Sequence, residues 1–239
     1  MFEHSEHLYD AIYAWKDYPA EVERLDAVIR ERLPDARTIL DVACGTGKHL
    51  ELLRGRGYEV AGVDLDRRML ELARERLGPD VPLHVGDLVD LDLGQTFDVV
   101  TCLFSSIAYA RTKEGLRNSV VSLARHARRM GLVLVEPFFT PDEFEPGHPW
   151  AVFVDQPDLK VARMDVSEVR DEIGVLNFHY LVASPSGVDY FTELHEVGLF
   201  TVDQYLDAFG GAGLEVTHDR DGPMGRGLYA GVKVRTPGE

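Results

Sequence analysis

The 239-residue chain has only two cysteines, few basic residues relative to acidic ones, and no long hydrophobic run. Cys44 and Cys102 both lie in apolar stretches, which excludes a disulfide scaffold and leads us to expect a reduced, cytoplasmic protein. Lysine and arginine number 25 against 41 aspartates and glutamates, a net charge of −16. This charge disfavours nucleic acid and anionic membranes as partners. No apolar run approaches the roughly 20 residues that cross a bilayer.

Strand-like and helix-like segments alternate five times before Pro137. Apolar runs rich in β-branched residues predict buried strands, and apolar residues at helical spacing lie between them. The runs are Thr38–Ala43, Val60–Val63, Val81–Val85, Phe97–Phe104 and Leu132–Val135. We place Ala127 on the helical stripe before the fifth run, and Asp66 at the N-cap of the helix after the second. Near-continuous apolar strands with helical crossovers indicate a doubly wound, mostly parallel sheet.

The pattern changes after Pro137. Residues 138–149 are rich in proline, phenylalanine and acid, and predict a loop or lid. Residues 159–170, 175–184 and 188–200 alternate with a period of two and predict an inserted antiparallel meander. A capping box from Thr201 to Gln204 predicts a helix, and two strands over 214–217 and 228–234 bring the main sheet to seven. We expect one domain from residues 1–137 and 201–239, with residues 138–200 forming the lid loop and insert.

The sharpest motif is the stretch Asp41–His49, DVACGTGKH, at the end of the first predicted strand. Glycines let the backbone approach a ligand closely, and a helix N-terminus offers free N–H groups. A dinucleotide fingerprint would need glycine at Leu50, and a P-loop would need serine or threonine at His49 and glycine at Val42. Because Asp41 would repel a pyrophosphate, the motif favours a loop that wraps a nucleoside.

Two further acids follow the next two predicted strands. Asp64 lies 19 residues after Gly45, where a carboxylate can accept both ribose hydroxyls. Asp87 follows the third strand and can accept from the exocyclic amine of an adenine. Each acid alone is also typical of a turn or a helix cap. Together with Asp41 they mark the carboxyl ends of three strands, where open α/β sheets bind ligands.

These residues resemble motifs I, II and III of the class I S-adenosylmethionine-dependent methyltransferases. The similar segments are residues 41–47, 62–65 and 86–88, with Ala43 where many members have a glycine. The resemblance implies a Rossmann-like sheet with a reversed last strand, S-adenosyl-L-methionine as cofactor and S-adenosyl-L-homocysteine as product. It implies that the methionine part contacts Asp41 and the glycine loop, and that the ribose contacts Asp64. The adenine would then lie near Leu65, Asp87 and Leu88. The cofactor contacts expected in this way are Tyr9, Tyr18, Asp41, Ala43, Gly45, Gly47, His49, Asp64, Leu65, Met69, Asp87, Leu88, Leu103 and Phe104.

A closer resemblance covers almost the whole chain. Residues 9–10, 16–18, 41–47, 104–107, 135–137 and 222–228 are similar to the TDP-3-amino-sugar N,N-dimethyltransferases of macrolide antibiotic pathways, of the desosamine and mycaminose type. This resemblance implies a nucleotide-linked amino sugar as substrate, an antiparallel insert and a homodimer. Members of the group can carry a histidine, a candidate base, where this chain has Tyr109. Because of this departure, either the identity of the base or the identity of the sugar stays open.

Methyl transfer from a sulfonium is an in-line displacement, so positioning supplies most of the rate gain. A base removes the ammonium proton of the amine. Tyr109 is the first candidate for that role or for positioning the amine, and Glu136 is the second. Tyr109 is equally typical of an aromatic residue lining a cleft, and Glu136 of a structural acid.

A nucleotide-linked sugar carries two phosphates. In a chain this acidic, a cation must lie locally where they bind. Arg226, which lies between two glycines, is the best candidate, because its guanidinium can bind bidentately. The expected substrate contacts are Tyr13, Lys16, Ser106, Tyr109 and Arg226. The aromatic residues near the N-terminus indicate either core packing or a segment that closes over the cofactor.

Other functions stay open on the sequence alone. They are an O- or N-methyltransferase for another small metabolite and a non-catalytic cofactor-binding domain. A nicotinamide dehydrogenase is disfavoured by Leu50. His4 and His7 have no third ligand nearby, so no metal site is predicted.

Overall fold

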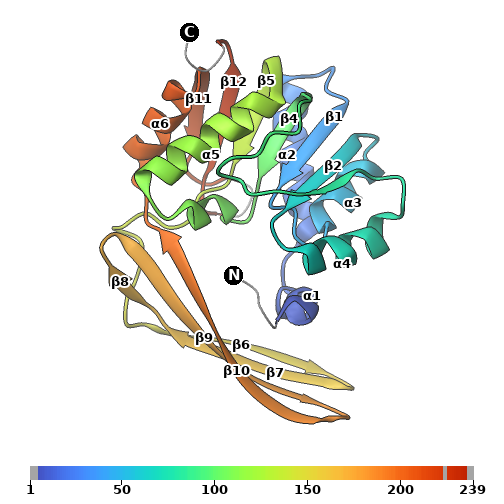
Figure 1. Cartoon of the computed structure of the whole chain (residues 1–239), viewed down its shortest axis with the longest axis vertical. Helices are drawn as coiled ribbons and strands as arrows, with labels where there is room; N and C mark the ends of the chain where they lie inside the picture. The colour runs from blue at the N-terminus through green and yellow to red at the C-terminus, as the bar shows by residue number, and fades with distance from the viewer. Residues whose placement is uncertain (1–4, 223–224, 236–239) are drawn as a thin grey trace.

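The computed structural model describes residues 5–222 and 225–235. They form a main sheet covered by helices and a second, antiparallel sheet (Figure 1). The main sheet has seven strands in the order β11-β12-β5-β4-β1-β2-β3. They are β1 Thr38–Val42, β2 Glu59–Asp64, β3 Leu83–Val85, β4 Phe97–Cys102, β5 Ala127–Val135, β11 Leu214–Asp219 and β12 Leu228–Lys233. Only β12 runs antiparallel to its neighbours, β5 and β11. The predicted doubly wound, mostly parallel sheet with a reversed last strand is confirmed.

Helices cover both faces of the main sheet. On one face lie α2 (Tyr18–Arg32), α3 (Lys48–Gly55) and α4 (Arg67–Leu77), and on the other lie α5 (Lys113–His126) and α6 (Val202–Gly211). Successive residues of β1 belong to opposite cores, since Ile39 packs toward the first helix layer and Leu40 toward the second. Burial on both faces explains why the strands are continuous apolar runs.

Local capping signals begin the helices where the sequence predicts them. The Asp66 side chain accepts from the backbone N–H of Arg68 at the start of α4. Thr201 and Gln204 form both hydrogen bonds of a capping box before α6. These two predictions are confirmed.

The second sheet is antiparallel and larger than predicted. It contains β6 Pro149–Gln156, β7 Leu159–Val166, β8 Glu168–Arg170, β9 Ile173–Ser184 and β10 Gly187–Gly198, with a main path β10-β9-β7-β6. The sequence missed β6, because its apolar residues do not alternate: Phe153, on the outward face, is 69% exposed. The predicted segment 159–170 is two strands, interrupted at Ser167.

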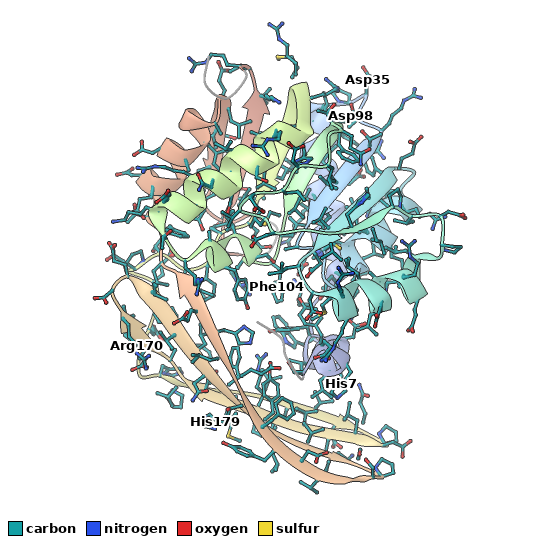
Figure 2. The ribbon with its side chains drawn as sticks, in the orientation of Figure 1. His7, Asp35, Asp98, Phe104, Arg170 and His179 are labelled. Atoms are coloured by element: carbon teal, nitrogen blue, oxygen red, sulfur yellow. The ribbon has the colours of Figure 1, made fainter. Side chains whose placement is uncertain are left out.

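Two boundaries of the main sheet also differ from the prediction. Ala127 begins β5 instead of ending a helix, so that strand runs from 127 rather than 132. Strand β4 ends at Cys102, and Phe104 lies beyond it. Phe104 and Ser105 have φ values of 52° and 63°, which turn the chain sharply away from the sheet. The turn directs Phe104 into the space between the two sheets (Figure 2).

The N-terminal segment, η1 (Glu6–Leu8) and α1 (Tyr9–Ile12), lies between the two sheets (Figure 1). Leu8 and Ile12 are buried in the core of the second sheet. On the other side, Asp10 pairs with Arg76 of α4. The segment therefore connects the inner face of the antiparallel sheet to the helices around the glycine loop.

Candidate active site

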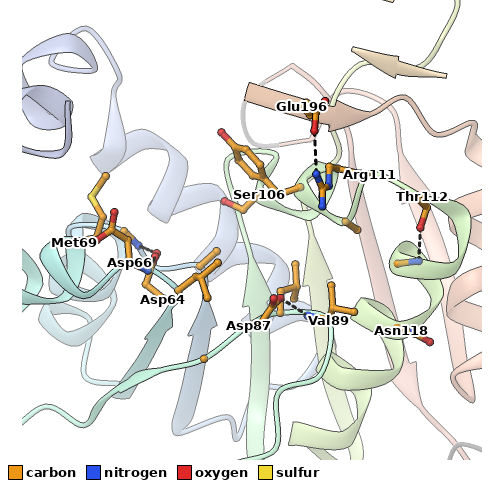
Figure 3. A pocket seen from close by; sticks show the side chains of 18 of the residues that line it. Asp64, Asp66, Met69, Asp87, Val89, Ser106, Arg111, Thr112, Asn118 and Glu196 are labelled. Carbon is orange, nitrogen blue, oxygen red and sulfur yellow. Dashed lines mark hydrogen bonds and ion pairs between the residues drawn. The ribbon is translucent and has the colours of Figure 1, made fainter. Parts of the chain in front are cut away.

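A cavity of about 760 Å³ opens at the carboxyl ends of β1, β2 and β3 (Figure 3). Its walls come from the loop after β1, from α4, from η2 (Ser106–Ala110), from the start of α5 and from the end of β10. A small cavity of about 30 Å³ lies beside it and shares Tyr9, Ala43, Gly45 and Ser106 with it. The larger volume is typical of a small-molecule site.

Most of the predicted cofactor residues line one of these two cavities. The larger one is lined by Tyr9, Ala43, Gly45, Asp64, Leu65, Met69, Asp87 and Leu88, together with Ser106 and Tyr109. The smaller one adds Tyr18, Asp41, His49, Leu103 and Phe104. Neither lining includes Gly47, Tyr13, Lys16, Glu136 or Arg226.

The glycine loop is fixed by the carboxylate of Asp64. That carboxylate accepts from the backbone N–H of Gly45 at 2.8 Å and from that of Asp66 at 2.9 Å. Gly47 packs against α4: its φ is 75°, and a Cβ there would lie 3.0 Å from Leu77. One acid thus positions the ends of β1 and β2 against each other.

Three buried acids surround this edge of the sheet. Asp41 accepts from the Thr101 hydroxyl at 2.7 Å, and burial raises its pKa to about 6. Burial also raises the pKa of Asp64 and of Glu136. Glu136 accepts from the backbone N–H of Phe104, and within the described residues its other oxygen is buried without a hydrogen-bond partner. Buried carboxylates of this kind are stabilised by a cation.

A charged cluster that the sequence analysis did not predict lies at the smaller cavity, whose lining includes one of its members, His49. Glu21 on α2 is 2.9 Å from the ammonium of Lys16 and 3.0 Å from the imidazole of His49. Lys16 also lies over the ring of Phe104, 3.8 Å from its centre. In the sequence, Glu21 is typical of an acid in the first turn of a helix, so it gave no signal.

Arg226 reaches the same region from the loop before β12. Its guanidinium donates to the Ser105 hydroxyl at 3.0 Å and lies over the rings of Phe104 and Phe139. The motif of residues 222–228 is described only in part, because residues 223 and 224 lie outside the described ranges. Arg226 and Lys16 thus both place positive charge against the ring of Phe104.

The antiparallel sheet contributes polar residues that the sequence did not single out. Arg163 on β7 donates to the Tyr13 hydroxyl at 3.0 Å. His195 on β10 is 2.6 Å from the hydroxyl of Tyr109. Burial raises the pKa of Tyr109 far above its ordinary value, so the side chain is a phenol at neutral pH. The two-residue alternation of the sequence predicts which residues share a face of a strand. It does not show which of the two faces is turned toward the cavity.

Among residues 5–222 and 225–235, no three histidine, cysteine, aspartate or glutamate side chains are arranged to hold a metal ion. His4, one of the two histidines weighed as ligands, lies outside those ranges. In the same part of the chain, no helix has the length and apolar character required to span a bilayer.

Comparison with known proteins gives matches over nearly the whole chain. Residues 39–131 match a family described as "Methyltransferase domain". The dTDP-4-amino-2,3,4,6-tetradeoxy-D-glucose N,N-dimethyltransferase of Saccharopolyspora spinosa is 39% identical over 95% of this chain and 91% of its own. The dTDP-3-amino-3,4,6-trideoxy-alpha-D-glucopyranose N,N-dimethyltransferase of Streptomyces venezuelae is 41% identical over 94% and 96% of the two chains.

Solved structures agree with these matches. DesVI of Streptomyces venezuelae superimposes with a TM-score of 0.90 at 40% identity, covering 97% of this chain and 99% of its own. CalS10, an amino pentose methyltransferase from Micromonospora echinaspora solved with S-adenosylmethionine bound, gives 0.85 at 34% identity, covering 98% of each chain. The chain belongs to the S-adenosylmethionine-dependent methyltransferase family that includes the dTDP-amino-sugar N,N-dimethyltransferases.

Proposed function

We propose that this protein transfers methyl groups from S-adenosyl-L-methionine to the amino group of a nucleotide-linked deoxy-amino sugar, in antibiotic biosynthesis. The observation that carries the proposal is the 39–41% identity to dTDP-amino-sugar N,N-dimethyltransferases over 94–95% of this chain. The cavity supports it, because the acids and glycines of the predicted cofactor site come together there from three strand ends.

The residues present fit this cofactor. Asp64 would accept the ribose hydroxyls, with Leu65, Asp87 and Leu88 around the adenine. Asp41, in the adjoining small cavity, and the glycine loop would meet the methionine part. The buried carboxylates suit a ligand that carries positive charge. When bound, the cofactor supplies an electrophilic methyl group on a sulfonium. The chain's own task is to hold the amine in line with it, exclude water and accept a proton.

The sugar nucleotide would lie between the two sheets, on the side of Phe104. Arg226 would bind the phosphates, with Lys16 beside it. Tyr13, Ser106 and Tyr109 would contact the sugar. Glu136 has an oxygen that is buried near these cations without a partner among the described residues, and it is the second candidate for holding the amine.

We expect cofactor binding to weaken below pH 6. The raised pKa of Asp41, about 6, means that this carboxyl is largely protonated in the empty site at lower pH. The α-ammonium of the methionine part, which S-adenosylmethionine and S-adenosylhomocysteine share, favours the carboxylate, so binding releases a proton there. Calorimetry with S-adenosylhomocysteine should show an affinity that falls up to about tenfold per pH unit below 6 and levels off above it.

Asp41→Asn should bind more weakly above pH 6 and show a flatter pH profile. Asp35→Asn, at the exposed opposite edge of the sheet (Figure 2), is the matched control and should follow the wild type. An affinity of the wild type that rises on acidification would contradict the assignment of Asp41.

We also infer a homodimer that buries the outward face of the antiparallel sheet. Leu181 pairs with Tyr190 on one side and with Ala162 on the other, and Ala162 pairs with Phe153. The side chains of Phe153, Leu181 and Tyr190 are 69%, 51% and 64% exposed. A contiguous apolar row is unusual on a monomer, and a second copy presents the same row. Light scattering should give a dimer for the wild type and a monomer for Leu181→Lys.

A turnover assay tests the substrate. The purified protein, S-adenosylmethionine and a panel of dTDP-amino sugars should yield S-adenosylhomocysteine and a methylated sugar, with mass spectrometry counting the methyl groups. Activity confined to phenols, carboxylic acids or free amines would favour the alternative of another small metabolite. Tight cofactor binding without transfer to any acceptor would favour a non-catalytic domain.

We also propose a division of the chain into two parts and a cytoplasmic location. Residues 1–137 and 201–239 would bind the cofactor, and residues 138–200 would cover the acceptor. A cytoplasmic location suits the two cysteines, which are buried and unpaired with each other.

A further inference from the structure

We propose that His195 of the antiparallel sheet accepts, through the hydroxyl of Tyr109, the proton that the substrate amine loses. The proposal rests on the proposed function, because it requires an amine acceptor. It assigns the proton to a residue on β10, 86 positions from Tyr109 in the sequence.

The contact between the two side chains has the geometry of a short hydrogen bond. The Tyr109 hydroxyl lies 2.6 Å from Nδ1 of His195. Tyr109 lines the larger cavity, whereas His195 does not line it and is only 2% exposed. The ring of Phe178 packs 5.0 Å from the imidazole. The imidazole therefore meets a molecule in the cavity through the phenol.

A second contact orients the imidazole. Nε2 of His195 faces the carboxylate of Glu193 at 3.7 Å. Glu193 is 4% exposed and accepts from both the backbone N–H and the hydroxyl of Ser5, at 2.9 and 2.6 Å. A fixed carboxylate on this side favours the tautomer with its proton on Nε2. Nδ1 is then the acceptor for the Tyr109 proton.

The surrounding charges leave His195 neutral and ready to accept. Burial lowers the pKa of His195, and Arg163 on β7 acts in the same direction, whereas Glu193 raises the pKa. Tyr13 and Tyr180 also face the pair, and burial raises the pKa of Tyr180 to about 12. Tyr109 cannot be the final acceptor, because its own pKa is raised by burial. The phenol passes the proton on and is unchanged.

The step balances without another reactant. One ammonium proton moves to the Tyr109 oxygen as the phenol proton moves to Nδ1 of His195, giving an imidazolium beside the Glu193 carboxylate. The freed amine lone pair forms the N–C bond while the C–S bond breaks, and that electron pair stays on sulfur. After the product leaves, the imidazolium passes its proton back through Tyr109 to solvent water in the open cavity.

Two variants test the relay by the pH dependence of kcat. In the wild type, kcat should rise with pH along a limb below pH 6.5, the ordinary pKa of histidine. His195→Gln should lower kcat at pH 7 by about 10²-fold, and its remaining activity should rise with pH as the free amine forms. Tyr109→Phe, which removes one oxygen, should show the same profile, and the double variant should lose little more.

The matched control is His179→Gln. His179 contacts the Tyr190 hydroxyl at 2.6 Å, but this pair lies on the outward face of the same sheet, away from the cavity and on the surface that the inferred dimer would cover. The variant should keep the wild-type profile, KM and affinity for S-adenosylhomocysteine. Light scattering checks that the variant keeps the oligomeric state of the wild type.

The outcomes separate the relay from the proposed function. A wild type that methylates no amino sugar removes both. If the wild type methylates an amino sugar and either His195→Gln or Tyr109→Phe keeps the acid limb and the wild-type kcat, the relay is excluded and the proposed function stands. If either variant only raises KM or weakens cofactor binding, and its pH profile is unchanged, the pair has a structural role and the proposal is overturned.

Discussion

Asp64→Ala is expected to weaken the binding of S-adenosylhomocysteine by roughly 10²- to 10⁴-fold. The carboxylate lies in the cavity at the end of β2, where it would accept two ribose hydroxyls. Two charge-assisted hydrogen bonds contribute about 1.5–3 kcal/mol each, and about 1.4 kcal/mol is tenfold in affinity. The same carboxylate also holds the N–H groups of Gly45 and Asp66, so the loop loses its support at the same time.

Calorimetry measures the effect, with thermal unfolding to separate lost contacts from a lost fold. Asp64→Asn keeps the size of the side chain and should fall between the wild type and the alanine variant. Asp90→Ala, an exposed acid on the loop after β3, should bind as the wild type does. A folded Asp64→Ala protein with wild-type affinity would remove the cofactor assignment.

Arg226→Ala should lower kcat/KM for a dTDP-amino sugar by about 10²-fold, mostly through KM. Its guanidinium is half-buried, is held by the Ser105 hydroxyl and lies over two aromatic rings. A bidentate, charge-assisted contact with a phosphate contributes about 2–3 kcal/mol in such a setting. Because the phosphates are remote from the reacting nitrogen, the loss should appear as weaker binding.

Steady-state kinetics against a series of acceptors makes this test specific. Arg226→Lys should recover part of the loss, because it restores the charge but not the fork geometry. Arg220→Ala, an exposed arginine on the same loop, is the control. Unchanged kinetics in Arg226→Ala would argue against a phosphate-bearing substrate.

The main sheet was predictable because its strands are buried on both faces. Continuous apolar runs such as Thr38–Val42, each followed by a helical stripe, leave little choice of fold. The cofactor edge was predictable for a related reason. Parallel strands bring their carboxyl ends to one edge, so acids far apart in the sequence, such as Asp41 and Asp87, were expected together.

The antiparallel sheet was harder to predict, and so was its share of the site. β6 lacks alternation, because apolar Phe153 remains on the outward face. The polar residues Arg163, Glu193 and His195 are spaced like any strand residues that share a face. Only the packing of α1 against this sheet shows which face is inward. Long-range placement of this kind leaves no local signal in the sequence.

The position of the N-terminal segment has a consequence for folding order. Ser5 is bound by Glu193, 188 residues further along, while Leu8 and Ile12 need strands of the insert to be buried. These residues leave the ribosome before their partners in the insert, which are synthesised more than a hundred residues later. Contacts of such high sequence separation form slowly. The parallel strands β1 to β5 can assemble during translation, whereas the N-terminal segment can pack against the antiparallel sheet only after residues 149–198 have been synthesised.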